Sequence, residues 1–379
     1  MILNINAKDL YTSLQKVAKV IPSKSTLPII TNVLINVSGN KLTLTGTDVQ
    51  NLISVTMELP VEYDNFSICL EAKKLLELLK ELGDIPIEIS FNKDNNNIII
   101  KTHYGTYTMV GSSSEDFPTF SSLSQENYSF AISESALYKS IKQTIFAVGN
   151  DASRPFVNNI YFDIKENLIN FVATDIHRVM IYTRSDISTN FNSFFLLPEK
   201  SASLLASLLD DKEEENKVIV SFDNRIANFL INENFIFSCR LSESMFPNYN
   251  TVIPTTRKYK FIIETSELID SIKRVSVLGN PATNLIKFEL SPNRIKVSAE
   301  DFDLSTSAEE ILPCTYEGEN FLICFRAYML EEILSHIESP YTAFEFNGPD
   351  KTFVIQPAET ISDHENVLAV IMPVRTPES

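Results

Sequence analysis

The sequence repeats itself three times, and this repeat limits the possible folds more than any other feature. Three helix-like segments align: AKDLYTSLQKV, ESALYKSIKQT and SELIDSIKRVS. In each of them a leucine precedes a serine by three places, and an aliphatic residue follows that serine. The leucines are Leu10, Leu137 and Leu268, so the two intervals between successive copies are nearly equal. A regular interval as long as a typical domain indicates tandem copies of one domain.

Each copy continues with a second helix-like segment and several strand-like runs. The second helices are EAKKLLELLKEL, PEKSASLLASLL and FRAYMLEEILSHI. Short alternating or β-branched runs predict strands. They are KLTLTGTD, IEISF, NNIIIKT, NLINFVATD, KVIVSF, NFIFSCRL, RIKVSAED and FVIQP. We therefore expect an α+β fold in which each third of the chain packs two helices on antiparallel sheets.

A Phe-Pro pair closes the first two copies. It occurs in EDFPTF and in SMFPNY, and the interval from Phe117 to Phe246 nearly matches the interval between the helices. This punctuation predicts domains at 1–124, 125–254 and 255–379. Two interpretations remain open: three domains used independently, or equivalent domains joined by heterologous contacts into a closed ring.

Basic residues lie opposite the apolar stripe of the first helix in each repeat. On a helical wheel, Leu10, Leu14, Val17 and Ile21 form one such stripe, and Lys8 lies on the other side. The net charge of the chain is nevertheless −17, from 32 Lys and Arg against 49 Asp and Glu. Such an excess of acid disfavours tight DNA binding. If the basic faces line one surface, the protein can still offer phosphates a weakly positive track.

The motif ATDIHRV at 173–179 raises three alternatives: a catalytic pair, a metal site, or neither. Asp175 and His177 lie two residues apart and could share one face of a strand. However, G-x-S-x-G, P-loop, G-x-G-x-x-G and H-E-x-x-H patterns do not occur in the sequence. Asp48 in TGTD occupies the equivalent place in the first repeat without a histidine. The Thr-Asp pair thus indicates fold architecture, and we expect neither catalysis nor a bound metal or cofactor.

Several stretches resemble the bacterial DNA polymerase III beta subunit family, the sliding clamps. They occur in the family's order: STLPIITNVLINVSGNKLTLTGTD, EDFPTF, ATDIHRV, FPNYNTVIP and IMPVR. The resemblance implies three tandem copies of the DNA-clamp fold and a head-to-tail homodimeric ring around double-stranded DNA, held without sequence specificity. It also implies a replication processivity factor without catalytic activity, whose partners are the polymerase III alpha subunit, the clamp loader and other proteins with clamp-binding peptides.

The same resemblance implies residues for two further surfaces. Those expected to face DNA are Lys24, Lys73, Lys139, Lys142, Arg154, Phe156 and Lys200. Pro155 stands where the family has an aromatic residue, which puts stacking there in doubt. Tyr107 matches the family's aromatic at the dimer interface, and Val277 and Leu278 match its apolar pair. As an alternative, these three are ordinary core residues.

The family's partner-peptide pocket, between the second and third domains, implies a third set. Its members here are Val157, Thr174, Ile176, His177, Arg178, Val179, Pro247, Thr251, Val252, Val370, Met372, Pro373, Val374 and Arg375. Three of them depart from the family: Ile176 replaces a common Gly, Thr251 a common Arg and Val374 a common Met. The final residues TPES extend past the usual end. These changes leave the preferred peptide open.

The remaining features concern the compartment of the cell. The start of the chain lacks a cationic segment followed by an apolar run, and no stretch approaches eighteen apolar residues. We therefore expect a cytoplasmic protein without a membrane partner. The four cysteines are scattered and predict reduced core thiols. An exported repetitive β-rich scaffold is a third class, and the missing signal argues against it.

Overall fold

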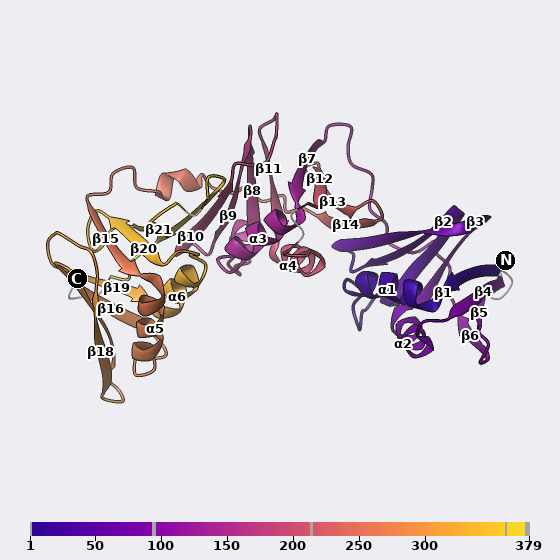
Figure 1. Ribbon diagram of the computed structural model, residues 1–379, viewed down its shortest axis with the longest axis horizontal. Helices are drawn as coiled ribbons and strands as arrows, with labels where there is room; N and C mark the ends of the chain where they lie inside the picture. The colour runs from indigo at the N-terminus through magenta and orange to yellow at the C-terminus, as the bar shows by residue number, and fades with distance from the viewer. Residues whose placement is uncertain (1, 93–95, 213–214, 361, 376–379) are drawn as a thin grey trace. The chain divides into compact units, whose positions relative to one another are not determined.

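The computed structural model describes residues 2–92, 96–212, 215–360 and 362–375. Each third of the chain contributes two α-helices, as the repeat predicts. They are α1 (Ala7–Ala18), α2 (Ala72–Leu82), α3 (Glu134–Ile145), α4 (Glu199–Leu208), α5 (Thr265–Ser276) and α6 (Ala327–Ser335). Three short 3-10 turns are η1 (Pro28–Thr31), η2 (Pro155–Asn158) and η3 (Tyr249–Val252). In the first and third repeats the two helices pack side by side (Figure 1).

The chain forms two compact units, which consist of residues 1–138 with 200–241 and of residues 139–199 with 242–379. The first unit has a four-stranded sheet, ordered β1 (Ile2–Asn6), β4 (Pro86–Asn92), β5 (Asn97–Lys101) and β6 (Thr106–Val110). Its six-stranded sheet runs β2 (Asn32–Thr47), β3 (Asn51–Glu71), β14 (Phe235–Arg240), β13 (Ile226–Asn232), β12 (Lys217–Phe222) and β7 (Tyr128–Ser133). Neighbouring strands are antiparallel in both sheets.

The second unit has the same plan with an eight-stranded sheet. Its order is β11 (Ser193–Pro198), β8 (Asn159–Lys165), β9 (Leu168–Thr174), β10 (Arg178–Arg184), β22 (Glu365–Ile371), β21 (Phe353–Pro357), β20 (Tyr341–Phe346) and β15 (Tyr259–Glu264). A four-stranded sheet runs β18 (Thr306–Pro313), β17 (Arg294–Asp301), β16 (Leu285–Ser291) and β19 (Phe321–Arg326). All eight runs predicted as strands lie on strands, so the α+β fold is confirmed.

The central repeat is divided between the two units. Strand β14 of the central repeat pairs with β3 of the first repeat. Strand β10 of the central repeat pairs with β22 of the third. Backbone hydrogen bonds therefore cross both repeat junctions within a continuous sheet. The domain limits at 124 and 254 stay a prediction, because these sheets do not end where the sequence repeat ends.

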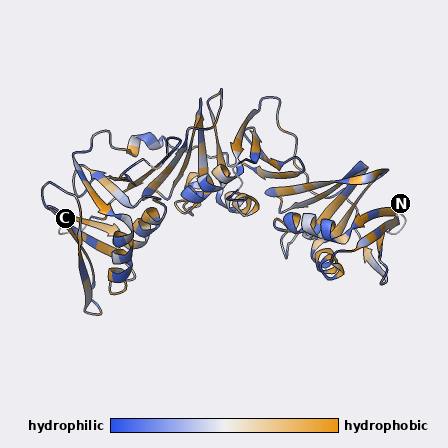
Figure 2. Ribbon diagram, in the orientation of Figure 1, coloured by the Kyte–Doolittle hydropathy of each residue, from blue (hydrophilic) through white to orange (hydrophobic). Residues whose placement is uncertain are grey.

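The first helices bury the stripe that the helical wheel predicts. Helix α1 buries Leu10, Leu14 and Val17, whereas Ile21 lies beyond its end at Ala18 and is only half-buried. Helix α5 buries its equivalent leucine, isoleucine and valine in the same way. Figure 2 shows these hydrophobic segments alternating with hydrophilic ones along the helices. Each fully buried aliphatic side chain stabilises the fold by about 1.5–3 kcal/mol.

The Thr-Asp pairs after β2 and β9 build the same turn in two repeats. The hydroxyl group of Thr47 donates to the carbonyl oxygen of Asn51, and the carboxylate of Asp48 accepts from two backbone N–H groups. Thr174 and Asp175 make the same bonds one repeat later. These hydrogen bonds agree with the architectural role that the repeat predicts for Thr-Asp.

Both turns force a β-branched residue into the left-handed region. Val49 has φ +77° and Ile176 has φ +73°. For a residue with a Cβ atom this conformation costs about 1–2 kcal/mol. A glycine avoids that cost, which gives a physical reason for the glycine that the resemblance implies at position 176.

We predict that Val49→Gly raises the free energy of unfolding by about 0.5 kcal/mol, because the strain that it relieves exceeds the backbone entropy that it adds. The matched control is Val61→Gly, which changes another exposed valine, in β3, without positive φ. That variant should lose about 1 kcal/mol. Thermal and urea unfolding measure both, and an equal loss in the two variants would show that the turn at Val49 is unstrained.

All four cysteines are buried and free, as predicted for core thiols. Burial raises the pKa of the Cys69 and Cys314 thiols to about 11. Within the described ranges, no helix combines the length and apolar character needed to cross a bilayer.

Candidate functional site

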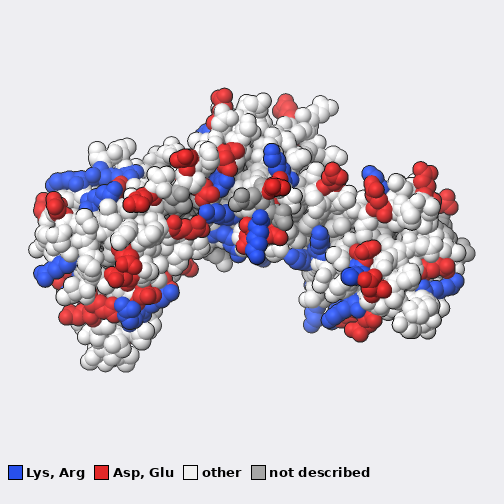
Figure 3. Space-filling model, viewed as in Figure 1, with Lys and Arg blue, Asp and Glu red and all other residues white. Residues whose placement is uncertain are grey.

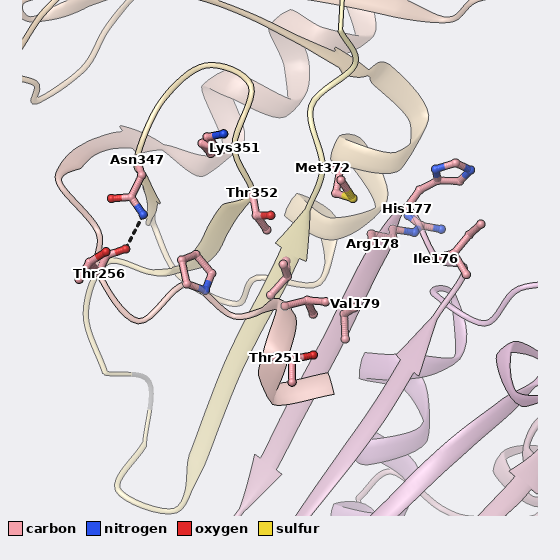
Figure 4. Close-up of a pocket in the computed structure, with 13 residues that line it drawn as sticks. Ile176, His177, Arg178, Val179, Thr251, Thr256, Asn347, Lys351, Thr352 and Met372 are labelled. Carbon is pink, nitrogen blue, oxygen red and sulfur yellow. Dashed lines mark hydrogen bonds between the residues drawn. The ribbon is translucent and has the colours of Figure 1, made fainter. Parts of the chain in front are cut away.

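A groove of about 660 Å³ opens at one end of the eight-stranded sheet in the second unit (Figure 4). Its volume lies within the range of small-ligand and peptide sites. Residues from the turn before β10, from η3 and the segment after it, from the β20–β21 connection and from the end of β22 form its walls. They are Ile176, His177, Arg178, Val179, Thr251, Val252, Pro254, Thr256, Asn347, Lys351, Thr352, Val370 and Met372.

Strand pairing places the apolar wall of the groove. Val179 of β10 lies opposite Val370 of β22 in the antiparallel ladder. Two residues further along, the backbone N–H of Met372 donates to the carbonyl oxygen of His177 at 3.1 Å. The Met372 side chain is 59% exposed. A flexible thioether thus stands at the mouth of the groove, beside residues that belong to the preceding repeat.

A buried tyrosine holds η3 against the sheet. The hydroxyl of Tyr249 donates to Asp163 at 2.8 Å and accepts from the amide of Asn170 at 3.0 Å. Burial and the contact with Asp163 raise the pKa of Tyr249 above its usual range. Because Tyr249 is fixed in this way, Thr251 and Val252 face the groove from a rigid support.

Arg178 is buried beneath the groove, with only 5% of its side chain exposed. Its guanidinium pairs with Asp175 at 3.1 Å and with Glu332 of α6 at 2.7 Å. It also donates to the carbonyl oxygens of Phe146 and Met329. All three nitrogens of its guanidinium group thereby bind groups within the protein. Arg178 joins α3 and α6 to the turn that carries the groove residues.

The geometry argues against the catalytic alternative for Asp175 and His177. Asp175 accepts from the backbone N–H of His177 at 3.0 Å, rather than from its imidazole. Its other oxygen binds the guanidinium of Arg178. A general base needs a partner that orients its ring. Among the residues that the structure describes, no group of three or more His, Cys, Asp or Glu is arranged to hold a metal ion.

Eight of the fourteen residues expected from the resemblance line the groove. They are Ile176, His177, Arg178, Val179, Thr251, Val252, Val370 and Met372. Val157 and Thr174 lie buried below it. Pro247, Pro373, Val374 and Arg375 do not form its walls, and Val374 instead donates its N–H to the carbonyl of Cys324 at 2.8 Å. The residues TPES at 376–379 fall outside the described ranges.

Five wall residues are missing from the sequence-based set. They are Pro254, Thr256, Asn347, Lys351 and Thr352. The segment FNGPDKT is rich in turn-forming residues and predicts a loop between two strands. The sequence of a loop does not show which distant strand the loop will contact. Only the order β22-β21-β20-β15 places these loops beside the turn at Ile176.

The residues expected to face DNA divide into two groups. Lys24, Lys73, Lys142 and Lys200 are exposed, and Lys73 lies 4.0 Å from the carboxylate of Glu77. In contrast, Lys139 pairs at 2.8 Å with both Glu338 and Glu365. Burial alone would lower the pKa of Lys139, but these two carboxylates raise it above its usual range.

Two further members of that set are also engaged within the fold. Arg154 binds Asp151 at 2.8 Å. The ring of Phe156 packs edge-on against Phe246, with 5.8 Å between ring centroids. Pro155 opens η2, a position where a missing N–H costs nothing. Lys139, Arg154 and Phe156 thus have partners within the fold, and their roles toward DNA stay predictions.

Ion pairs weaken the basic helix faces as well. Lys8 pairs with Asp84 at 2.9 Å, and Arg274 binds Glu310 through two hydrogen bonds of 2.7 Å. In Figure 3, Lys and Arg are interspersed with Asp and Glu on the presented face of each unit. The expected positive track is therefore weaker than the sequence pattern alone suggests.

The equivalent junction in the first unit has a different side chain in the place of Met372. There the backbone N–H of Arg240 donates to the carbonyl of Gln50 at 3.0 Å, which repeats the bond that Met372 makes. The Nε atom of Arg240 donates to the carbonyl of Val49 at 3.1 Å. Its guanidinium lies 5.0 Å from the ring centroid of Phe120. Arg240 thus covers the surface that Met372 leaves open.

The residues expected at a dimer interface lie on or beside edge strands. Tyr107 is half-buried on β6, which is the edge of its four-stranded sheet. Val277 and Leu278 follow α5, and both are exposed. The alternative that all three are core residues therefore fails for Val277, which is 79% exposed.

Comparison with known proteins matches each of the three repeats to a domain of one family. The family models of the DNA polymerase III beta subunit match residues 1–121 with the N-terminal domain, 131–248 with the central domain and 250–375 with the C-terminal domain. The chain belongs to the DNA polymerase III beta subunit family. It is a sliding clamp, a processivity factor of DNA replication without catalytic activity.

Individual relatives match this clamp from end to end. The beta sliding clamps of Haemophilus influenzae and Bacillus subtilis are each 26% identical to it, over 99% of this chain and 100% of their own. The solved DNA polymerase III subunit beta of Pseudomonas aeruginosa superimposes with a TM-score of 0.90 at 25% identity, covering 99% of this chain and 100% of that one. The solved clamp of Bacillus subtilis gives 0.89 at 25% identity, covering 99% of each.

We predict that Arg178→Ala lowers the free energy of unfolding by about 3 kcal/mol, because it leaves two carboxylates and two carbonyl groups without their partner. Arg375→Ala is the matched control, since Arg375 is exposed and its nearest carboxylate, Asp350, lies 4.0 Å away. Calorimetry of both variants measures the difference. An Arg178→Ala variant as stable as the control would show that Arg178 contributes nothing to this joint.

Proposed function

We propose that the groove of the second unit is the site at which this clamp receives peptide segments of its protein partners. The observation that carries the proposal is an apolar, partly exposed surface formed by Val179, Val252 and Met372 on a rigid sheet end. A flexible methionine accommodates varied side chains. The partners would be the polymerase III alpha subunit, the clamp loader and other proteins that carry a suitable peptide.

We also infer how the ring would close. The edge strands β6 and β18 present unpaired backbone groups, which favour pairing with another chain. A head-to-tail homodimer would join β6 and Tyr107 of one protomer to the partner's Val277, Leu278 and β18. Double-stranded DNA would then be held by enclosure, with Lys24, Lys73, Lys142 and Lys200 offering weak phosphate contacts. The protein would work in the cytoplasm.

The test of enclosure uses the full-length protein, a clamp loader and nicked circular DNA. The loaded clamp should leave the DNA when a restriction enzyme opens the circle, because a ring slides off free ends. Gel filtration before and after cutting measures the bound fraction. Retention on linear DNA would contradict topological tethering.

We predict that Met372→Ala weakens the binding of an apolar partner peptide by about 1–2 kcal/mol, as truncation of an anchor site does. Pro373→Ala should change the affinity less, because Pro373 does not form the groove wall. Fluorescence anisotropy gives both affinities, and solution mass confirms that the dimer is intact. Equal affinities of wild type and Met372→Ala would remove this residue from the site.

A further inference from the structure

The groove has two chemically different ends. Figure 4 shows Ile176, Val179 and Met372 toward one side, and Thr256, Asn347 and Lys351 toward the other. The first end is mainly apolar. The second carries two threonine hydroxyls, an amide and an ammonium group, all from the segment before β15 and the β20–β21 connection.

The polar end is built on a fixed loop. The amide nitrogen of Asn347 donates to the carbonyl oxygen of Thr256 at 2.6 Å (Figure 4). Its oxygen accepts from the backbone N–H of Lys258 at 3.0 Å. Asn347 therefore ties the two connections together. These two bonds join the two connections that form the polar end of the groove.

Positive charge at this end is only partly compensated. The side chain of Lys351 is 63% exposed, and its ammonium group lies 3.5 Å from the carboxylate of Asp350. Asp350 is also approached by Arg375 at 4.0 Å. Two cations thus share one carboxylate. None of the thirteen described wall residues is acidic, and the other cation among them, Arg178, is already paired.

A cationic wall is notable in a chain with a net charge of −17. The long-range field of such a protein repels an acidic ligand, so a local cation contributes selectivity rather than bulk attraction. An ammonium group on a flexible stem binds a carboxylate through charge-assisted hydrogen bonds. Hydroxyls such as those of Thr256 and Thr352 add further donors.

We propose that Lys351 is a specificity-determining residue that selects peptides in which a carboxylate lies near the apolar anchor. The inference rests on the proposed role of the groove and adds the chemistry of its ligand. The carboxylate comes either from an Asp or Glu side chain or from the C-terminus of the peptide. In both cases the anchor lies at the Met372 end and the carboxylate at the Lys351 end.

The experiment uses the full-length protein and four synthetic peptides that share a Leu-Phe anchor. In two of the peptides the residue about three positions from the anchor is Glu, and in the other two it is Gln. Within each pair, one peptide has a free C-terminus and the other an amidated C-terminus. Wild type should bind a peptide with a carboxylate about 2- to 5-fold more tightly than the amidated Gln peptide, as expected for an exposed ion pair. High salt should reduce this preference. The four peptides show which carboxylate is used.

Four variants separate the role of Lys351 from that of the rest of the groove. Lys351→Gln should remove the preference, and Lys351→Glu should reverse it. Lys41→Gln, which makes the same charge change at an exposed residue of the first unit, should keep it. Met372→Ala should weaken all four peptides alike.

The outcomes distinguish this inference from the proposed function. A preference that is absent in wild type, or that persists in Lys351→Gln, overturns the role of Lys351 while the groove stands if Met372→Ala still weakens binding. If no peptide binds wild type, or if Met372→Ala has no effect, then the groove is not the peptide site and both proposals fail.

Discussion

The backbone ladder between β10 and β22 is the interaction on which the second unit depends. It pairs seven residues of the central repeat with seven of the third, from Arg178 opposite Ile371 to Arg184 opposite Glu365. Through this ladder the turn at Ile176 meets the segment at Met372. The ladder thus brings together two walls of the groove that come from different repeats.

Buried arginines lock both ends of that ladder. At one end Arg178 is bound by Asp175 and Glu332. At the other end Arg184 binds Asp186 and Glu365. Burial alone would raise the pKa of Glu365, but the hydrogen bonds of Lys139 and Tyr182 lower it, so the carboxylate stays charged. Removing one member of such a cluster would leave the other charges buried without their partner, which is strongly destabilising. The intact cluster therefore makes the joint between the repeats rigid.

The two junctions between repeats, where β3 pairs with β14 and β10 pairs with β22, share one backbone arrangement but present different surfaces. Both have a Thr-Asp turn, a β-branched residue with positive φ, and a backbone hydrogen bond just beyond the end of the ladder. They differ in the side chain that follows the ladder. Arg240 covers the first junction through Val49 and Phe120, whereas Met372 leaves the second open. Duplication therefore supplied the scaffold, and the side chain that follows the ladder distinguishes the two junctions.

The sequence alone determined the threefold repeat, the two helices of each copy, the strands and the family, because periodicity and local turn chemistry are encoded over short distances. It also predicted much of the apolar wall. Tertiary structure alone decided which loops meet that wall, so Thr256, Asn347 and Lys351 were missed. It also decided which charges are paired with distant parts of the chain. A lysine opposite an apolar stripe looks available to phosphate, but Lys139 meets two carboxylates that belong to the third repeat, and no local pattern reveals such a partner.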